Sequence, residues 1–335
     1  MLVLGRSQVE ELLDMGALID ALAPAMADLS RGHASAPPRT AALVPDRSGF
    51  LAAMPGFVPS AGALVSKLVS LFPENAGTRL PTHQALIAVF DPETGEPVAL
   101  LDGTAITAAR TGACSALSAR LLAREDSTVL AVLGTGVQAR AHAHAMCRVR
   151  PIREIRVAGR DPEKAAALAA ELCSASGTPE APRVEVRAVA TYAEALDAAD
   201  IVAAATHATE PVVRLDWLAP GAHVTSVGYN PAGREVDDAT VVQSLVCVES
   251  REAALAPFPA GSNDLLSPIR HGLITAEHVH AELGELITGS RPGRTAPGQI
   301  TLYKSVGVSV QDAAAAALVL GAARERGKGE EVSLR

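Results

Sequence analysis

The sequence predicts an α/β protein, with a Rossmann-type doubly wound sheet and a second, α+β domain. Three observations lead to this fold class. Strand and helix patterns alternate between residues 128 and 248, which is typical of βαβ units and a parallel sheet. A turn of the form Gly134-x-Gly136-x-x-Ala139 lies between the first of these strands and a helix. Earlier in the chain, short strand-like runs are separated by glycine and proline.

The composition argues against several classes of protein. The chain has 335 residues, a formal net charge of −8 and 48% hydrophobic residues, enough for about two domains of roughly 150 residues. An acidic chain without a basic run is not expected to bind nucleic acid. No apolar run approaches the ~18 residues of a membrane span, and the first residues do not resemble a signal peptide. We therefore expect a cytoplasmic protein, and the four cysteines, none in a CxxC pair, are expected to be reduced thiols.

The first domain is predicted to begin with a helix and to continue as strands. Ser7 and Glu10 have the spacing of a capping box, which would open a helix extending to about residue 29. Strands are expected at residues 40–44, 50–54, 63–71, 84–91 and 98–101. A helix over residues 104–123 follows and leads into the second domain.

The second domain is predicted as alternating strands and helices. Strands are expected at residues 128–133, 154–158, 184–189, 201–205, 223–227 and 245–248, and helices at residues 138–149, 162–174 and 192–196. The final helix, residues 310–326, is almost entirely apolar, so we expect it to pack back onto the first domain or onto a subunit interface. The tail after Gly327 is expected to be disordered. The predicted domains are residues 1–118, with 308–335 packing back, and residues 119–307.

The glycine-rich turn predicts a dinucleotide site. Gly134 permits the tight turn, and Gly136 lets the backbone approach a pyrophosphate. The helix that begins near Val137 and Gln138 presents free N–H groups and the positive end of its dipole. An ordinary glycine turn is the alternative, but it leaves the surrounding βαβ pattern unexplained.

The residues at the end of the second strand of this domain indicate whether the cofactor is NAD or NADP. An acidic residue there binds the ribose hydroxyl of NAD, whereas an arginine accommodates the 2′-phosphate of NADP. Gly159 stands at the acidic position, and Arg160 and Lys164 offer positive charge. Asp161 is expected to be a helix N-cap. The sequence therefore favours NADP(H), with NAD(H) possible.

Two cations lie on apolar faces of the first domain. In the strand at residues 63–71, alternation places Lys67 in the middle of the more apolar side. Arg110 shares the core stripe of its helix with Ile106 and Leu117. Burying an unpaired charge is costly, so each cation needs either a structural Asp or Glu partner or a bound carboxylate. Finding both cations in one domain favours the ligand, and Arg39 is a weaker third candidate.

The histidines do not predict a metal site. His142 and His144 are two residues apart, as are His278 and His280, and residues at this spacing diverge on a helix. No hydrolase signature, such as G-x-S-x-G or a Cys–His arrangement, is present. We therefore expect neither a metal nor hydrolase chemistry.

Six further segments, in order along the chain, point to a known family: LPTHQALIAVFDPETGEPVALLDG, ITAARTGACSALSARLLA, VLGTGVQARAH, AAATHATEPV, SVGYNPAGREVD and TLYKSVGVSVQDAAAA. On these segments the chain resembles the ornithine cyclodeaminase/mu-crystallin family, essentially from end to end. The resemblance implies a homodimer whose N-terminal part, joined by the last helix, is a substrate-binding and dimerisation domain.

The resemblance also implies roles for individual residues. Arg39, Lys67 and Arg110 would hold a substrate carboxylate, and Thr82, within LPTHQ, is included with them as a substrate-binding candidate. The residues expected to line the nucleotide are Arg110, Thr111, Gly134, Gly136, Val137, Gln138, Arg160, Lys164, Thr206, Val227 and Ser305.

Two departures from the family pattern bear on the reaction. Where ornithine cyclodeaminases carry an acidic residue, this chain has Asn230, which cannot act as a general base near neutrality. Ala52 likewise replaces a glutamate. Both changes weaken recognition and deprotonation of a diamino acid, so the reductase branch of the family is the closer resemblance, and Asn230 is a candidate catalytic position together with Lys67 and Arg110.

The expected function is therefore NADPH-dependent reduction of a small cyclic imino acid, of the Δ1-pyrroline-2-carboxylate or Δ1-piperideine-2-carboxylate type, to an amino acid. The alternatives are ornithine cyclodeaminase, which would give proline and ammonia with tightly held NAD, an amino acid dehydrogenase that acts on alanine, and a non-catalytic binder of small molecules that depends on NADPH.

Overall fold

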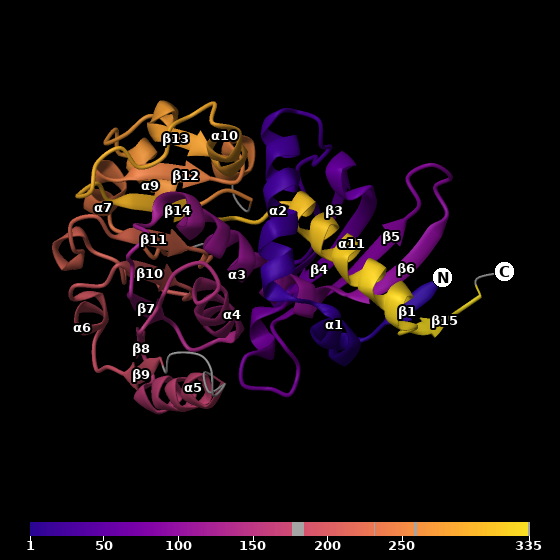
Figure 1. Ribbon diagram of the computed structural model, residues 1–335, viewed down its shortest axis with the longest axis horizontal. Helices are drawn as coiled ribbons and strands as arrows, with labels where there is room; N and C mark the ends of the chain where they lie inside the picture. The colour runs from indigo at the N-terminus through magenta and orange to yellow at the C-terminus, as the bar shows by residue number, and fades with distance from the viewer. Residues whose placement is uncertain (176–183, 231, 258–259, 334–335) are drawn as a thin grey trace. The chain divides into compact units, whose positions relative to one another are not determined.

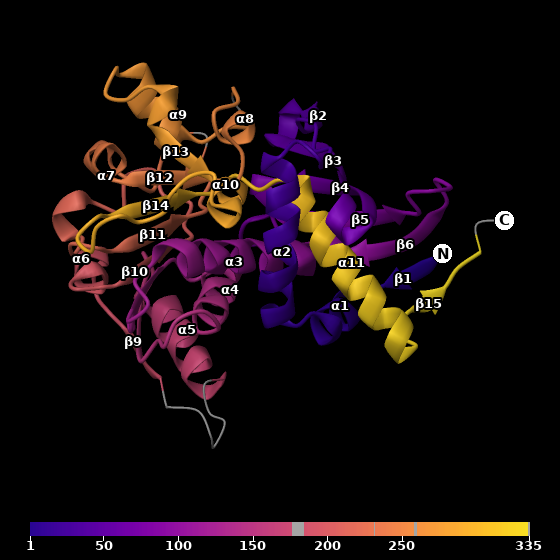
Figure 2. The same ribbon diagram turned by 45° about the horizontal axis from the view of Figure 1, so that its top comes forward.

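The computed structural model describes residues 1–175, 184–230, 232–257 and 260–333. Its chain divides into two compact units: Met1–Arg110 with Gly307–Arg335, and Thr111–Val306. The first division falls inside helix α3 (Gly103–Leu122), eight residues before the boundary expected at residue 118. The second division, between Val306 and Gly307, falls one residue before the expected junction between residues 307 and 308. Figures 1 and 2 show the elements of both units.

A seven-stranded sheet forms the centre of the first unit. Its strand order is β15-β1-β6-β5-β4-β3-β2. The strands are β1 (Leu2–Leu4), β2 (Thr40–Val44), β3 (Gly49–Val58), β4 (Ala63–Leu71), β5 (His83–Phe90), β6 (Pro97–Asp102) and β15 (Glu330–Glu331). Strands β2 to β6 form an antiparallel meander, and β1 joins β6 in parallel. Short 3-10 helices at Pro45–Arg47, Pro59–Ala61 and Pro73–Asn75 follow β2, β3 and β4.

One face of this sheet is covered by α2 (Met15–Ser30) and α11 (Ser309–Arg326). Figure 2 shows the yellow α11 lying beside the indigo α2, and α11 also contacts β3, β4 and β5. Alternation in β4 points Val65, Lys67 and Val69 to this covered face. The final helix thus returns to the first unit, as the sequence predicts.

The first helix differs from the prediction. Instead of one helix to about residue 29, there are two, α1 (Arg6–Leu12) and α2, because Leu13 is extended. Asp14 caps α2, its Oδ1 accepting the N–H of Ala17 at 2.8 Å. The predicted capping box at Ser7 and Glu10 is wrong: the N-cap of α1 is Gly5, two residues earlier, and the N–H of Gly5 donates to the Gln8 side chain.

The C-terminal tail is ordered as far as the structure describes it, contrary to the expectation of disorder after Gly327. Strand β15 pairs with β1 in antiparallel register. The N–H of Val332 donates to the carbonyl of Met1 at 2.9 Å, and Lys328 forms an ion pair with Glu11 at 3.0 Å. These contacts join the two ends of the described chain.

The second unit holds an eight-stranded parallel sheet in the order β13-β12-β14-β11-β10-β7-β8-β9. The strands are β7 (Val129–Leu133), β8 (Glu154–Ala158), β9 (Glu185–Ala188), β10 (Ile201–Ala204), β11 (His223–Ser226), β12 (Leu245–Val248), β13 (Val279–Glu282) and β14 (Thr301–Lys304). The chain goes outward from β7 to β9 and then returns to β10 on the other side of β7. This reversal is the switch point at which doubly wound sheets bind ligands.

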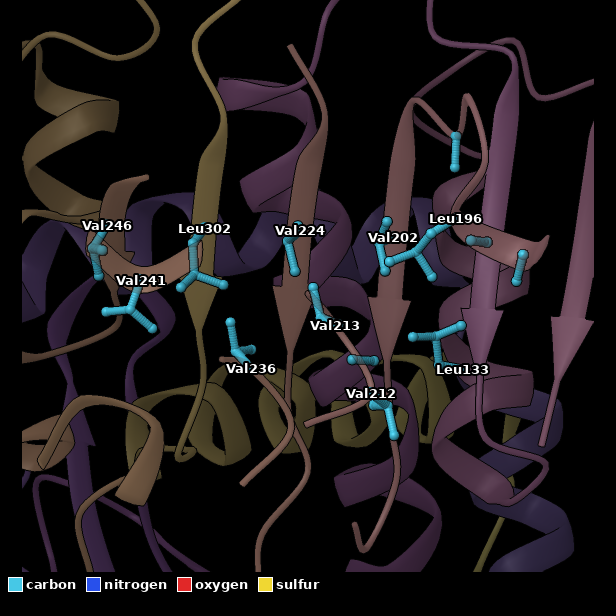
Figure 3. Close-up of a cluster of buried hydrophobic side chains, with 14 of the residues drawn as sticks. Leu133, Leu196, Val202, Val212, Val213, Val224, Val236, Val241, Val246 and Leu302 are labelled. Carbon is cyan, nitrogen blue, oxygen red and sulfur yellow. The ribbon is translucent and has the colours of Figure 1, made fainter. Parts of the chain in front are cut away.

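The remaining helices belong to this unit. They are α4 (Val137–Met146), α5 (Pro162–Ala175), α6 (Tyr192–Leu196), α7 (Asp238–Gln243), α8 (Arg251–Ala254), α9 (Asn263–Arg270) and α10 (Leu283–Thr288), with 3-10 turns at Leu215–Trp217 and Ala276–His278. Figure 3 shows buried side chains of adjacent strands in one layer, among them Val202, Val224 and Leu302. This aliphatic core fixes the strands whose carboxyl ends carry the site.

Candidate functional site

Lys67 and Arg110 meet at a shared carboxylate in the first unit. Lys67, on β4, is 2% exposed, and its Nζ lies 2.8 Å from Oδ2 of Asp312. Arg110, on α3, has Nε 3.1 Å from Asp312 Oδ1 and donates from Nη1 to Gln311 Oε1 at 2.6 Å. Asp312 is fully buried near the start of α11. The structural ion pair that the sequence left open is therefore formed by both cations.

The charges around Asp312 do not cancel. Lys67 and Arg110 bring two positive charges against its single negative charge. Arg39, half-buried, donates from Nη2 to the carbonyl of Gly307 at 2.9 Å and adds to the positive potential at Lys67. Burial, opposed by Asp312 and assisted by Arg110 and Arg39, lowers the pKa of Lys67 to about 8. The excess positive charge makes this cluster suited to a small carboxylate.

His83 and Thr82 stand at the start of β5. Burial, followed by the charges of Lys67 and Arg110, lowers the pKa of His83 to about 4, so its ring is neutral near pH 7. Thr82 is half-buried, and its carbonyl accepts the N–H of Phe72 at 2.8 Å. Its predicted role toward a substrate stays a prediction.

The sequence patterns that identify Lys67 and Arg110 do not identify Asp312. A lone aspartate inside the apolar segment VQDAAAAALVL is an available signal, because a buried carboxylate requires a partner. Its partners, however, lie more than 200 residues earlier in the chain. Local periodicity indicates which cations point inward but not which acid they meet.

The turn after β7 has the geometry of a phosphate site. Gly134 has φ +111°, and a Cβ there would lie 2.5 Å from the carbonyl oxygen of Ala205, so only glycine fits. A Cβ on Gly136 would meet nothing within 4 Å. Gly136 is the N-cap of α4 and gives its first N–H groups no side-chain partner. Gln138 Oε1 is buried without a hydrogen-bond partner among the described residues. An open helix N-terminus with free donors fits the pyrophosphate of a dinucleotide.

The end of β8 carries the predicted cationic pair. Arg160 is exposed, and a Cβ on Gly159 would lie 2.7 Å from Thr135 Cγ2. Asp161 accepts the backbone N–H groups of Glu163 and Lys164 at 3.1 and 3.2 Å, which makes it the expected N-cap. Its other oxygen lies 3.5 Å from Lys164 Nζ. Part of the Lys164 charge is thus shared with Asp161, and Arg160 is the principal candidate for a 2′-phosphate.

Three more nucleotide candidates follow the strands of the other half of the sheet. Thr206 follows β10, Val227 follows β11, and Ser305 follows β14. The Val227 N–H donates to Ala204 O at 3.0 Å, and the Ser305 hydroxyl donates to Glu249. Thr111, the remaining candidate, is buried on α3.

Asn230 lies in the loop after β11. Its Nδ2 donates to the carbonyl of Ala208 at 3.0 Å, and its Oδ1 accepts the N–H of Ala232 at 2.9 Å. The amide thus joins its loop to the segment after β10 with a donor and closes its own turn with an acceptor. Its assignment as a catalytic position stays a prediction.

Buried histidines of the second unit have hydrogen-bond partners. His142 lies 2.8 Å from the Ser115 hydroxyl and 2.7 Å from the carbonyl of Gln138, and burial lowers its pKa to about 4.

No group of three or more His, Cys, Asp or Glu side chains within the described ranges has metal-binding geometry. Over the same ranges, none of the helices combines the length and hydropathy needed to span a bilayer.

The second unit has a doubly wound parallel sheet with an open glycine turn at its switch point, and the first unit has buried cations; together these features define the class of two-unit dinucleotide-binding proteins. The chain belongs to the ornithine cyclodeaminase/mu-crystallin family, whose family model matches residues 1–327.

Reductases are among its relatives. The chain is 36% identical to ketimine reductase mu-crystallin of Mus musculus over 306 residues, which cover 90% of each chain. It is 34% identical to a Δ1-pyrroline-2-carboxylate reductase of Bacillus cereus over 334 residues, 99% of each. Among solved structures, Δ1-pyrroline-2-carboxylate reductase of Thermococcus litoralis, in complex with NADH and L-proline, matches with a TM-score of 0.93 and 39% identity, covering 99% of this chain and 100% of the other. These proteins are similar over nearly their full lengths.

Proposed function

We propose that the protein reduces a small cyclic imino acid, of the Δ1-pyrroline-2-carboxylate or Δ1-piperideine-2-carboxylate type, to the L-amino acid. It is an NAD(P)-dependent oxidoreductase acting on a C=N bond. The observation that carries the proposal is the buried cluster in which Lys67 and Arg110 share one carboxylate, Asp312, and retain excess positive charge. A substrate carboxylate would supply the missing negative charge.

The residues of the first unit bind and orient the substrate in this proposal. Charge-assisted hydrogen bonds from Arg110 and Lys67, with Arg39 nearby, would fix the carboxylate and thereby the adjacent C2 carbon. A nicotinamide coenzyme, when bound, supplies the hydride that C2 accepts. Because an iminium carbon is already electrophilic, the main demand on the protein is orientation.

NADPH is the proposed hydride donor. The relative from Thermococcus litoralis was solved with NADH, so the preference rests on this chain's own residues. Arg160 follows β8 directly, and the carboxylate of Asp161 is engaged by backbone N–H groups of α5. An exposed arginine beside an engaged aspartate favours a 2′-phosphate over a free hydroxyl.

Asn230 favours reduction over cyclodeamination. An amide that donates to Ala208, in the segment after β10, and accepts from Ala232 does not replace the acidic residue that the family's cyclodeaminases use. Reduction of a preformed imine does not require a base at this position. The proposed reaction is therefore compatible with the side chain present.

The protein is also proposed to be a cytoplasmic homodimer. None of the four cysteines, all within the described ranges, forms a disulfide, which supports a reducing compartment. A structural relative, the archaeal alanine dehydrogenase at 29% identity and TM-score 0.89, was solved as a dimer with bound NAD. Exposed leucines on the first unit's sheet, Leu51, Leu68 and Leu86, support an interface on that face.

The test is turnover of candidate substrates by the purified protein. Each cyclic imine is incubated with NADPH, and oxidation is followed at 340 nm; we expect turnover of at least one five- or six-membered imine. Absence of oxidation across cyclic and open-chain imines would overturn the proposal. Formation of proline and ammonia from ornithine, without net coenzyme oxidation, would show a lyase instead.

A further inference from the structure

The second unit contains a buried carboxylate to which the nucleotide prediction assigns no role. Glu235 is 2% exposed. Its Oε1 accepts hydrogen bonds from the backbone N–H and the hydroxyl of Thr206, at 2.5 and 2.7 Å. Its Oε2 accepts from the Ser226 hydroxyl and the Gly228 N–H, both at 2.7 Å. All four of these groups donate, so both carboxylate oxygens act only as acceptors.

The network around Glu235 includes a third strand. Lys304, the last residue of β14, is 1% exposed and lies 2.8 Å from Asp264 Oδ2. Its Nζ also donates to the Ser226 hydroxyl and to the carbonyl of Gly228, each at 2.9 Å. Asp264 Oδ1 in turn accepts the backbone N–H of Glu235 at 2.8 Å. The carboxyl ends of β10, β11 and β14 are therefore tied together by buried charged groups.

The packing around Glu235 leaves no space for a side chain at position 228. A Cβ on Gly228 would lie 2.3 Å from the Glu235 carboxyl carbon and 2.3 Å from the Thr206 carbonyl oxygen. Glycine is thus required where the loops after β10 and β11 converge on Glu235. The position of each loop depends on the carboxylate between them.

These loops lie at the carboxyl edge of one half of the doubly wound sheet. The turn after β7 is suited to the pyrophosphate, and the end of β8 to the adenosine ribose. In such sheets the second half, here β10, β11 and β14, receives the other nucleotide of the dinucleotide. The nicotinamide half of the coenzyme is therefore expected over the loops that Glu235 holds.

We propose that Glu235 is a positioning residue for the nicotinamide half of the coenzyme. It acts through Thr206 and the Gly228 backbone, whose placement it fixes by hydrogen bonds. The proposal rests on the proposed nicotinamide-dependent function. None of these hydrogen bonds reaches the turn after β7 or the end of β8, so the two halves of the ligand should respond differently to the loss of Glu235.

The experiment measures, by calorimetry, the Kd of two ligands for the wild type and for Glu235→Gln. The substitution keeps the shape but turns one acceptor oxygen into an NH2 group that faces donors. We expect the Kd for NADPH to rise at least tenfold, while 2′-phospho-ADP-ribose, which lacks nicotinamide, binds within twofold of wild type. Glu171→Gln, which removes an exposed carboxylate paired with Arg140 in the same unit, serves as the control and should change neither affinity.

Thr206→Val provides a second variant, because it removes one donor to Glu235 and keeps the side-chain shape. It should raise the Kd for NADPH by a smaller factor than Glu235→Gln does. If Glu235→Gln does not fold, this variant tests the proposal in its place. Equally weaker binding of both ligands would show that Glu235 supports the fold in general and would overturn the proposal. Unchanged binding of NADPH would overturn it too. Wild-type protein that binds neither ligand would overturn the proposed function itself, and this inference with it.

Discussion

Lys67 is a buried ammonium that titrates near physiological pH. Its own burial and its neighbours Arg110 and Arg39 lower its pKa to about 8, despite the opposing charge of Asp312. Below that pH the side chain is charged and can attract a carboxylate. Above it, the neutral amine loses most of that attraction, so substrate capture depends on pH through this residue.

The predicted consequence is an alkaline decline in kcat/KM, which reports ionisable groups of the free enzyme and of the free substrate. As pH rises through about 8, kcat/KM for the imine should fall in the wild type. In Lys67→Arg the decline should be absent up to about pH 9.5, because guanidinium stays protonated. Initial rates at subsaturating imine across this range measure both profiles. The same decline in Lys67→Arg would assign the titration to another group, such as the substrate nitrogen.

Arg160 is predicted to set the coenzyme preference. Hydrogen bonds to charged groups contribute roughly 1.5–3 kcal/mol, so the Kd of NADP(H) should be at least about tenfold lower than that of NAD(H). Arg160→Ala should remove most of this difference by weakening NADP(H) alone. Titration of protein fluorescence with each coenzyme gives the ratio. Arg148→Ala, at another exposed arginine of the second unit, should leave the ratio unchanged, and equal binding of both coenzymes to wild type would contradict the prediction.

At the scale of elements, α2 depends on a single cap. Asp14 accepts the N–H of Ala17 at the point where the chain leaves the extended Leu13. Asp14→Ala should lower the free energy of unfolding by about 0.5–2 kcal/mol, the usual cost of losing an N-cap. Chemical denaturation monitored by circular dichroism measures the difference. Asp14→Asn retains a capping oxygen and should stay close to wild type; an equal loss in both variants would count against capping as the cause.

Sequence patterns predict elements where the periodicity is long enough to read. The expected strand at residues 63–71 coincides with β4 at both ends, because nine alternating residues carry a clear period. Strands β1 and β15 were missed because three and two residues hold almost no alternation. Strand β14 escapes prediction although the equally buried β10 and β11 are predicted, because its four residues, TLYK, include a threonine and a lysine and do not form an apolar run.

The same limit applies to the candidate site. Alternation and helical spacing identify Lys67 and Arg110 as inward-facing, and the strand–turn–helix context identifies Gly134 and Gly136. Asp312 and Glu235 could not be assigned, because their partners come from other elements of the tertiary structure. Pairing across the fold requires the topology, which local pattern does not contain.

At the scale of the whole molecule, one sheet face of the first unit exposes apolar side chains. Leu51, Leu68 and Leu86 are 48%, 41% and 48% exposed, and Leu68 is paired with Leu86 across β4 and β5. Side chains of this kind, clustered on neighbouring strands, indicate a protein interface. The proposed homodimer would cover them.

We predict that Leu68→Asp combined with Leu86→Asp converts the dimer to a monomer, because two carboxylates would be desolvated at the interface of each subunit. Sedimentation velocity gives the mass in solution. Leu273→Asp places one such charge at an equally exposed leucine of the second unit and should leave the proposed dimer intact. A double variant that still sediments as a dimer would move the interface away from this face.

The closure of the first unit by α11 has a consequence for synthesis on the ribosome. Arg110 is translated 202 residues before Asp312, a delay of roughly 10–40 s at ~5–20 residues per second. The second unit, continuous from Thr111 to Val306, is synthesised during this interval and can fold before α11 emerges, whereas Lys67, Arg110 and the inner sheet face await their last helix. Nascent chains stalled after residue 306, with a spacer that clears the exit tunnel, should therefore resist protease in the second unit and be cut in the first. For that interval the unfinished half is the part that a chaperone would have to protect.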